Sequence, residues 1–457
     1  MRVLRGLLLS VILATALAAT RAFTPYASVK PILSEYREQL PAELKDADQA
    51  KWLAYARRQD LSIRARLQQG ELDSMVNLLL YGASFTQQPR ILMGGLTEAS
   101  KAGVLRARVD DLVAGLRSPG DNERLIFLQR FLRSQGIDPG TSDGPKETGV
   151  FILQNLQRVI QERKTLAARA ADATADNKPG DPSSLLDRSS LFRDRGVSLD
   201  TGIIPDFSIE QTLRDLKQRG VLREGQVARV AVIGPGLDFI DKNEGSAYDY
   251  YPQQTLQPFA LYDSLVRLQL AKTNALSVSI FDISAPVIQH IQRARERAGK
   301  GIGYVIQLPR DVARPWPPQL IGYWNALGDR VGTSIAPIAP PGIFRGLETR
   351  AVLIRPDVVL ACEPIDLNIV LERLNLAAAD HFDLMVATNI FVYYDAFEQT
   401  LALENAGAML KPGGLLLTND RLPTVSSGSM RLAGVTVVPF DSPGVRERHA
   451  VGWYRKQ

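Results

Sequence analysis

Residues 227–239 read VARVAVIGPGLDF, a run of β-branched and small apolar residues that stops at two closely spaced glycines, Gly234 and Gly236. A continuous apolar run of this length predicts a strand that is buried on both faces, as in a parallel sheet. Glycines directly after such a strand let a ligand approach the backbone with no Cβ in the way. The stretch therefore predicts an α/β fold with a nucleotide-like ligand at the end of this strand.

From this strand to the C terminus, apolar runs alternate with helical segments. Such alternation predicts a mainly parallel sheet with helices on both faces. The last two runs are joined by only nine residues, DSPGVRERH, which is too short for a crossover helix, so they should be antiparallel. We therefore predict an α/β fold with a seven-stranded, Rossmann-like, mostly parallel sheet whose last strand is antiparallel. The seven runs are VARVAVIG, LSVSIFD, VVLACEPI, FDLMVATN, GGLLLTN, VTVVPF and AVGWYRK.

The N-terminal half has a different pattern. Helical periodicity over residues 26–172 predicts an all-α domain ahead of the sheet. It is clearest in DNERLIFLQRFLRSQG, where leucines share one face and Asp121 can cap the helix start. Residues 173–205 are rich in Asp, Ser and Pro, which predicts a linker, and the sheet domain is expected over residues 206–457.

Composition narrows the class of protein. The chain has 457 residues, 45% of them hydrophobic, which is enough for two domains with sizeable cores. Its 54 Lys and Arg against 49 Asp and Glu give a formal net charge of +5, which indicates a solvated surface, so no nucleic-acid partner is predicted. The single cysteine, Cys362, excludes an internal disulfide, and its strand-like surroundings predict a buried thiol. The three histidines lie far apart, and no metal site is predicted.

Residues 1–22 have the three parts of a secretory signal peptide: Arg2 and Arg5, an apolar stretch, and small residues with Ala-x-Ala spacing. The expected cleavage follows Ala18 or Ala22. The apolar stretch is shorter than a membrane span needs, and no later segment resembles a transmembrane helix. Export, or association with a membrane, is therefore expected; a cytoplasmic location is expected if the N terminus is not a working signal.

Ligands of open α/β sheets bind at the carboxyl ends of the strands, so the residues that end the first four runs are the candidates for the site. Asp282 has two oxygens that can accept hydrogen bonds from both hydroxyls of a ribose. Asp366 could accept a hydrogen bond from an adenine amino group. A dinucleotide fits less well, because the G-x-G-x-x-G pattern needs glycine at Phe239 and a helix directly after the turn.

These stretches resemble the class I S-adenosylmethionine-dependent methyltransferases, and most closely the branch that methylates chemotaxis receptors. The matching segments are VAVIGPG, SIFDIS and, with the most specific spacing, HFDLMVATNIFVYYDAFEQTLALENAGAMLKPGGLLLTND. The resemblance covers the C-terminal half from Val227 onward and does not extend to a substrate. It implies S-adenosylmethionine as the cofactor and a small molecule or a protein as an unidentified methyl acceptor.

The resemblance also implies roles for single residues. Gly234 and Gly236 would lie under the methionine part, Asp282 would bind the ribose, Asp366 would lie near the adenine, and Asn389 beside the methyl donor. Two positions depart from the family pattern. Val232 replaces an acidic residue two positions before the first glycine, and Asp238 replaces the third glycine. The substitutions imply either loss of cofactor binding or a role for Asp238 in binding the ligand's ammonium group.

Methyl transfer needs a general base only when the acceptor must first lose a proton. Tyr393 and Tyr394 are the candidates near the donor, and packing in the core is the alternative for both. Asp395 is expected to be a helix N-cap. An exported protein lacks access to a cytoplasmic methyl donor, so two functions stay open. One is an active methyltransferase held at the membrane or in the cytoplasm by an uncleaved N terminus, and the other is an exported, non-catalytic protein on a degenerate methyltransferase fold that binds a ligand or a partner.

Overall fold

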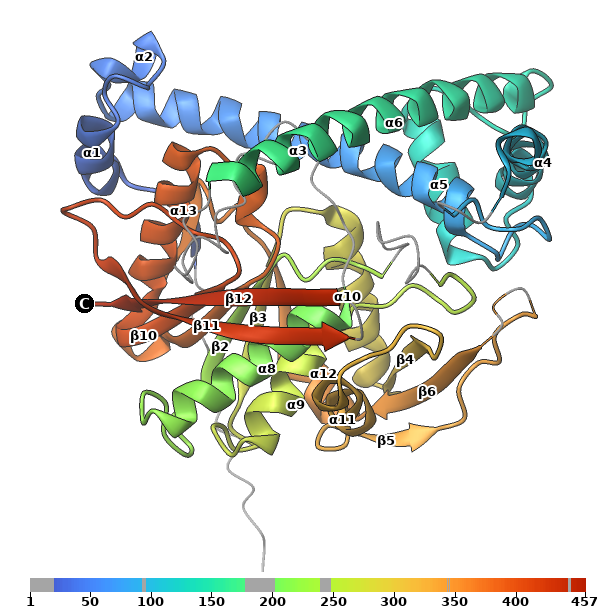
Figure 1. The fold of residues 1–457 in the computed structure, drawn as a ribbon. Coiled ribbons are helices and arrows are strands. Elements are labelled where there is room, and N and C mark those ends of the chain that lie inside the picture. Colours follow the sequence, from blue (N-terminus) through green and yellow to red (C-terminus); the bar gives the residue numbers. More distant parts are fainter. Residues whose placement is uncertain are drawn as a thin grey trace, which may run out of the picture.

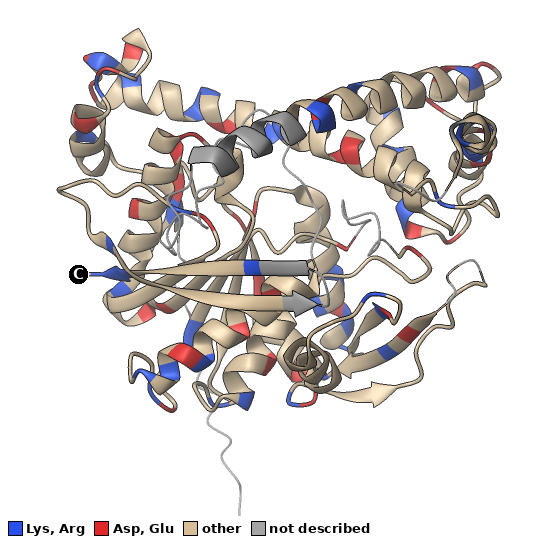
Figure 2. Cartoon of the chain, in the orientation of Figure 1, with Lys and Arg blue, Asp and Glu red and all other residues tan. Residues whose placement is uncertain are grey.

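The computed structural model describes residues 20–92, 96–176, 202–238, 248–342, 344, 346–442 and 445–457. Figure 1 shows a central sheet with one long helix, α3 (Gln49–Tyr81), crossing above it. Basic and acidic residues are interspersed over the elements in Figure 2. In the described part of the chain, no helix is long and apolar enough to cross a membrane.

The predicted seven-stranded sheet is confirmed. Its strand order is β11-β12-β10-β9-β2-β3-β7, and the pairs along β10, β9, β2, β3 and β7 are parallel. The predicted reversal of the last strand is also confirmed, because β12 pairs antiparallel with both β10 and β11. The strands are β2 (Arg229–Ile233), β3 (Ser277–Asp282), β7 (Cys362–Asp366), β9 (Phe382–Ala387), β10 (Leu410–Thr418), β11 (Met430–Ser442) and β12 (Val445–Lys456).

Strand β2 shows how the sheet separates two cores. Its side chains alternate between faces, so Val230 and Val232 enter one core while Ala231 and Ile233 enter the other. The first core is closed by α8 (Ile203–Gln218), α9 (Gln257–Arg267), α10 (Ala285–Ala298) and α12 (Pro356–Leu360). The second core includes α13 (Ala396–Met409). Short 3-10 turns lie at Ala378–Asp380 and Phe391–Tyr393.

A second, smaller sheet lies between α10 and α12 in the chain. It has the order β4-β6-β5 and is antiparallel throughout. Its elements are β4 (Tyr304–Asp311), α11 (Pro318–Ala326), β5 (Gly332–Ile335) and β6 (Leu347–Ile354). Tyr323 and Trp324 of α11 are buried in the first core, so these two rings attach the insertion to the main sheet.

The N-terminal segments join the second core instead of forming a domain of their own. Strand β1 (Thr20–Phe23) pairs antiparallel with β8 (Glu372–Asn375). Helices α1 (Tyr26–Glu35) and α2 (Ala42–Lys45) follow, and Trp52 and Ile63 of α3 are fully buried in the same core. The expected separate all-α domain over residues 26–172 is therefore not confirmed.

The second half of α3 belongs to another core, with α4 (Glu98–Arg117), α5 (Glu123–Ser134) and α6 (Gly144–Asp176). Helix α3 thus connects this helical layer to the sheet (Figure 1). Helix α6 continues to Asp176 and α8 begins at Ile203, so both ends of the segment predicted as a linker are helical. Residues 177–201 lie outside the described part.

Candidate cofactor site

The backbone of the turn after β2 favours glycine at positions 234 and 236. Gly234 and Gly236 have φ values of 62° and 66°, a left-handed conformation that side chains disfavour. A Cβ on Gly234 would also lie 2.2 Å from Cδ1 of Ile390, which is far inside van der Waals contact. The turn is held to the neighbouring strand because the Gly234 amide donates to the Phe281 carbonyl over 2.8 Å.

Asp282 ends β3 beside this turn. Only 9% of the residue is exposed, and its Oδ1 accepts a hydrogen bond from the Ser284 amide at 2.7 Å. Burial raises the pKa of Asp282 to about 7, although the amides of Ser284, Ile283 and Gly236 act in the opposite direction. The carboxyl therefore carries a proton for part of the physiological pH range and can donate or accept.

A small cavity of about 40 Å³ lies between these residues at the carboxyl ends of β2 and β3. This is the edge where open α/β sheets bind ligands. Of the residues predicted for the site, the structure brings Gly234, Gly236, Asp282 and Tyr394 to the cavity wall. The complete lining is Leu67, Ile233, Gly234, Gly236, Phe281, Asp282, Ile283, Leu367, Asn368, Ile369, Ile390 and Tyr394.

Leu67, on α3, closes this cavity from the N-terminal part of the chain. Sequence reasoning missed it, since an apolar residue in an amphipathic helix gives no local sign of the strand end that it will cover. Leu67 also packs against the second core, partly buried. Leu67 and the part of α3 around it, which we call the cover, therefore belong to the packing of the second core.

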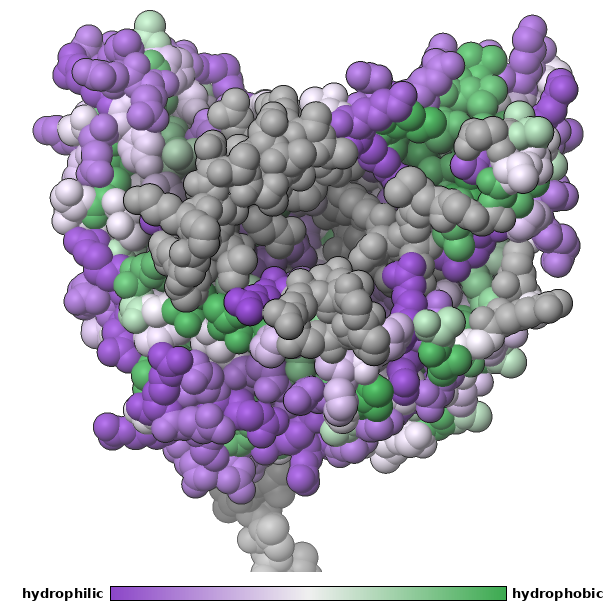
Figure 3. Space-filling model, viewed as in Figure 1, coloured by the Kyte–Doolittle hydropathy of each residue, from purple (hydrophilic) through white to green (hydrophobic). Residues whose placement is uncertain are grey.

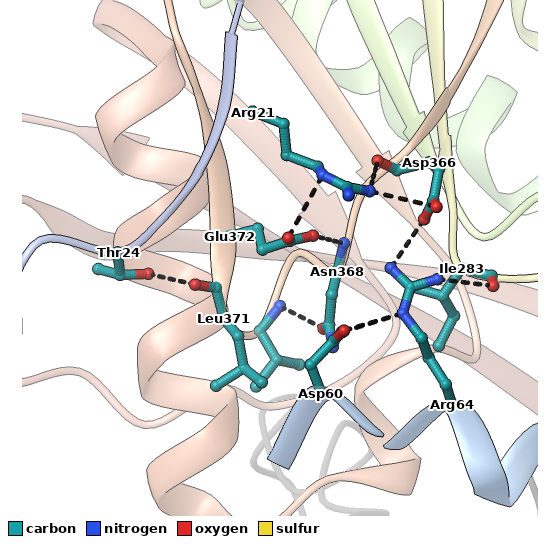
Figure 4. Close-up of polar contacts among 10 residues, drawn as sticks. Arg21, Thr24, Asp60, Arg64, Ile283, Asp366, Asn368, Leu371 and Glu372 are labelled. Atoms are coloured by element: carbon teal, nitrogen blue, oxygen red, sulfur yellow. Dashed lines mark hydrogen bonds and ion pairs between the residues drawn. The ribbon is translucent and has the colours of Figure 1, made fainter. Parts of the chain in front are cut away.

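Asp366, predicted to lie near an adenine, is engaged by two arginines from the N-terminal segments (Figure 4). Its Oδ1 lies 2.8 Å from Arg64 Nη2, and its Oδ2 lies 3.2 Å from Arg21 Nη1. Arg64 belongs to α3 and Arg21 to β1. The carboxylate is 49% exposed and is not part of the cavity wall.

Arg64 and Arg21 make further contacts, which connect α3 and β1 to the segment after β7 at several points. Arg64 Nε lies 3.0 Å from Asp60 Oδ2, and Asp60 Oδ1 accepts a hydrogen bond from the Asn368 side chain at 2.8 Å. Arg21 Nε lies 3.4 Å from Glu372 Oε1, whose other oxygen accepts from the Asn368 amide at 2.9 Å. Figure 4 shows these contacts as one connected network.

Asn389 and Asp395, in the segment after β9, do not line the cavity. Asn389 has a φ of 58° and exchanges two 2.7 Å hydrogen bonds with Asn419 across the strand ends, and it is not part of the cavity wall. Asp395 caps α13 through a reciprocal capping box with Glu398, as predicted.

The two candidate tyrosines are both buried, with Tyr394 4% and Tyr393 6% exposed. The Tyr393 carbonyl accepts a 2.6 Å hydrogen bond from Arg66, whose guanidinium lies 5.9 Å from the centre of the Tyr394 ring. Burial raises the pKa of Tyr394, so its hydroxyl is protonated at neutral pH. Only Tyr394 reaches the cavity.

Asp238 is turned toward an internal network. Its Oδ2 accepts hydrogen bonds from the Tyr251 hydroxyl at 2.6 Å and from Gln254 at 3.1 Å, and its carbonyl accepts from Arg124 at 3.0 Å. Burial raises the pKa of its carboxyl. These contacts join the glycine turn to the segment before α9 and to α5, and Asp238 is not part of the cavity wall.

The structure also bears on Val232, on Cys362 and on the dinucleotide alternative. Val232 is fully buried in the sheet, where an acidic side chain would be desolvated. Cys362 is fully buried as predicted, and burial raises the pKa of its thiol to about 12. The first described helix after the glycines begins only at Gln257, so no described helix end meets a pyrophosphate at the turn.

Comparisons with known proteins find only distant likenesses. No protein-family model matches the chain, and no curated protein matches its sequence. Among solved structures, the chain is similar to the mitomycin 7-O-methyltransferase MmcR, at 13% identity and a TM-score of 0.29, over 89% of this chain and 99% of that one. It is also similar to TrmN from Thermus thermophilus, at 10% identity and a TM-score of 0.24, over 55% of this chain.

A third similar structure is the glycopeptide N-methyltransferase MtfA in complex with S-adenosylmethionine, at 11% identity and a TM-score of 0.22, over 54% of this chain. The match spans about half the length of TrmN, 52%, and 66% of MtfA. At these TM-scores the likenesses carry no functional argument.

Proposed function

We propose that the chain is an S-adenosylmethionine-dependent methyltransferase with an unidentified acceptor. The observation that carries this proposal is the meeting of two left-handed glycines and a buried carboxyl in one cavity, at the ends of adjacent parallel strands. A ligand that joins a ribose to a chain needing close backbone contact matches both features. Asp282 is assigned to the ribose, and Gly234 and Gly236 to the methionine part.

The types of residue that line the cavity fit this cofactor, but the volume of the cavity is too small for it. Sites for ligands of this class usually enclose about 300–1,000 Å³. The cavity here has about 40 Å³, and Leu67 and Ile390 are among the residues that line it. Binding therefore requires Leu67, and with it this part of α3, to move outward. Release of both Arg64 and Arg21 from Asp366 would also free the carboxylate assigned to the adenine.

S-adenosylmethionine, when bound, supplies an electrophilic methyl group. The residues around it have to orient the ligand and exclude water, because an in-line displacement gains most from positioning and a dry site. Asp282 would fix the ribose, and Leu67 on α3 would cover the site again after binding. Tyr394 is assigned to the cavity wall as a neutral hydroxyl. The general-base role predicted for Tyr393 and Tyr394 is not favoured, because the Tyr394 hydroxyl stays protonated and Tyr393 does not line the cavity.

A second candidate function is favoured by the closed cover itself. In a non-catalytic protein on this fold, the ion pairs of Arg21 and Arg64 with Asp366 would be permanent, and the cavity would stay too small for a nucleoside. Such a protein would bind a different ligand or a partner.

The location of the protein is also a proposal. We infer that residues 1–22 are a signal-like segment that stays uncleaved in an active methyltransferase, because an exported protein lacks access to the cytoplasmic donor, and that is cleaved on export in the non-catalytic alternative. Residues 1–19 lie outside the described part. Cleavage after Ala22 would remove Arg21 and most of β1, whereas cleavage after Ala18 would keep both. N-terminal sequencing of the native protein distinguishes these outcomes, and an intact Met1 would mean that the signal is not cleaved.

Isothermal titration of the full-length chain with S-adenosylmethionine and S-adenosylhomocysteine tests the proposed function. We expect both ligands to bind, and we expect Asp282→Ala to weaken both. A folded protein that gives no heat with either ligand would contradict the methyltransferase proposal and support the non-catalytic one. The variant Asp329→Ala, at an exposed carboxylate that follows α11 and does not line the cavity, is the matched control.

A further inference from the structure

Helix α4 presents a long face that no other described helix covers completely. The residues on this face recur every three or four positions, which is the spacing of one side of an α-helix. They line a groove between α4 and α6. The α4 wall comprises Ala102, Leu105, Arg106, Val109, Asp110, Val113, Ala114 and Arg117, with Ser118 after the helix end.

Helix α6 forms the opposite wall with Pro145, Lys146, Gly149, Val150 and Leu153. The groove encloses about 1050 Å³. Val150 and Leu153 are 50% and 43% exposed, so large apolar side chains on this wall contact water. Figure 3 shows apolar residues gathered at the upper right, over α4 and α6, with hydrophilic residues around them.

Gly149 leaves the groove deeper than the packing of the two helices requires. A glycine inside a helix costs about 1 kcal/mol relative to alanine. A Cβ at Gly149 would meet only Val113 Cγ2, at 4.0 Å, which is ordinary contact. Neither a positive φ nor a close neighbour in the described structure explains the glycine, whereas a side chain inserted by a partner would use the space.

The charges at the groove are mainly positive. Arg106, Arg117 and Lys146 line it, against the single carboxylate of Asp110. Arg106 and Arg117 lie on α4, about three helical turns apart, and Lys146 lies on the facing wall. An occupant with apolar anchors and acidic flanks would therefore match both the lining and the charges.

We propose that the groove binds an amphipathic helix from an acidic partner protein, with apolar side chains at i, i+3, i+4 and i+7 inserted between α4 and α6. From Ala102 to Ser118 the α4 wall is about 24 Å long at 1.5 Å per residue, enough for four turns of a bound helix. An acyl chain is less suited, because it has one anionic end, whereas cations line both walls.

The test uses the full-length chain and two fluorescein-labelled helical peptides of about 18 residues. Both carry leucines at the spacing above; one has Glu on the flanks and the other has Lys. Fluorescence anisotropy should show the Glu peptide binding about tenfold or more tightly than the Lys peptide. In the double variant Arg106→Glu/Arg117→Glu, the preference should reverse.

Filling the groove gives a second readout that does not depend on charge. Gly149→Leu should abolish binding of the Glu peptide, because the new side chain occupies the depression. Gly103→Leu is the matched control. Gly103 lies inside α4, has nothing within 4 Å of its Cβ position and does not line the groove, so binding should be unchanged.

Circular dichroism melting shows whether each variant is folded. Equal binding of the two peptides, or full binding by a folded Gly149→Leu variant, would overturn the proposal. It would also be overturned if a fluorescent fatty acid bound in a Gly149-dependent way while neither peptide did. None of these outcomes depends on the proposed methyltransferase activity, because the groove shares no residue with the cofactor cavity.

Discussion

Two hollows in the described part of the chain differ in character. The cavity at the strand ends encloses about 40 Å³ and is covered by Leu67, while the groove between α4 and α6 encloses about 1050 Å³ and is open along its length. Special backbone conformations and a buried carboxyl build the first. The second is built from ordinary helix faces.

This difference indicates how each hollow is used. A buried carboxyl with a raised pKa reduces the stability of the folded state above the pKa of the unfolded chain, and such groups are typical of functional sites. An exposed apolar groove needs only a partner that covers it. Helix α3 joins the two regions, since Leu67 near its middle lines the cavity and residues between Met75 and Tyr81 pack in the core that α3 shares with α4.

The largest expected effect concerns the glycine turn. Gly234→Ala should lower the free energy of unfolding by about 2–5 kcal/mol, because a left-handed alanine costs about 1–2 kcal/mol and the clash with Ile390 adds an overpacking penalty. Gly301→Ala is the matched control: its φ is 80°, but nothing lies within 4 Å of its Cβ position. Denaturant titrations of both variants measure the difference, and equal losses would mean that Ile390 does not restrict the turn.

The second effect is a dependence of stability on pH. The pKa of Asp282 is raised from 3.8 to about 7, so the folded state holds its proton at pH values where the unfolded chain has lost it. Stability should therefore fall as the pH rises from about 4 to 7, by up to about 4 kcal/mol at 1.36 kcal/mol per unit.

Asp282→Asn cannot titrate and should lose this part of the pH dependence, which urea denaturation at pH 5 and pH 8 measures. Asp357 provides a comparison of opposite sign. Its bond with Arg355 lowers the pKa of its carboxyl, so its contribution to stability is present above the unfolded pKa and is lost as the pH falls. Parallel pH profiles for wild type and Asp282→Asn would contradict the assignment.

Much of the sheet could be predicted from sequence because its signals are local. The apolar run before Gly234 and the short link between β11 and β12 each determine one feature within a few residues. Local signals also limit precision. The run VVLACEPI was predicted as one strand, but Pro356 starts helix α12 and the strand begins only at Cys362. Likewise, Asn122 caps α5 in place of the predicted Asp121.

The candidate site was only partly predictable from the sequence, because some of the residues that meet there lie far apart in the chain. Gly234, Gly236 and Asp282 end strands of one sheet, so the fold brings them together. Arg64 and Arg21 lie 302 and 345 residues from Asp366, and an arginine on a helix usually marks its solvated face. The sequence pattern shows no link between such residues, so the cover was visible only in the structure.

The third expected effect is on ligand affinity. If Asp282 binds the ribose, Asp282→Ala should weaken binding of S-adenosylhomocysteine by about 10–100-fold, because a hydrogen bond to a charged group contributes about 1.5–3 kcal/mol. Calorimetry at pH 8, where the carboxyl is ionised, gives the clearest value. A loss of less than about threefold would mean that the ribose does not contact this residue.

The smallest expected effect distinguishes the two candidate functions. It is a gain in ligand affinity, whereas Asp282→Ala should cause a loss. Arg64→Ala removes the ion pairs with Asp366 and Asp60, which are partly exposed and worth about 0–1 kcal/mol each. If α3 must move for the cofactor to enter, loss of these pairs makes the movement easier, so S-adenosylhomocysteine should bind up to about fivefold more tightly.

Arg58→Ala is the control for this variant, because its ion pair with Glu43 lies on α3 and α2, away from the cavity, and its loss should leave the affinity unchanged. If Arg64→Ala binds more weakly than wild type, Arg64 contacts the ligand and the cover is part of the binding site. If the wild type and both variants give no heat with the ligand, the cover is permanent. The cavity is then a remnant of the fold, and the open groove is the site that remains to explain this protein's function.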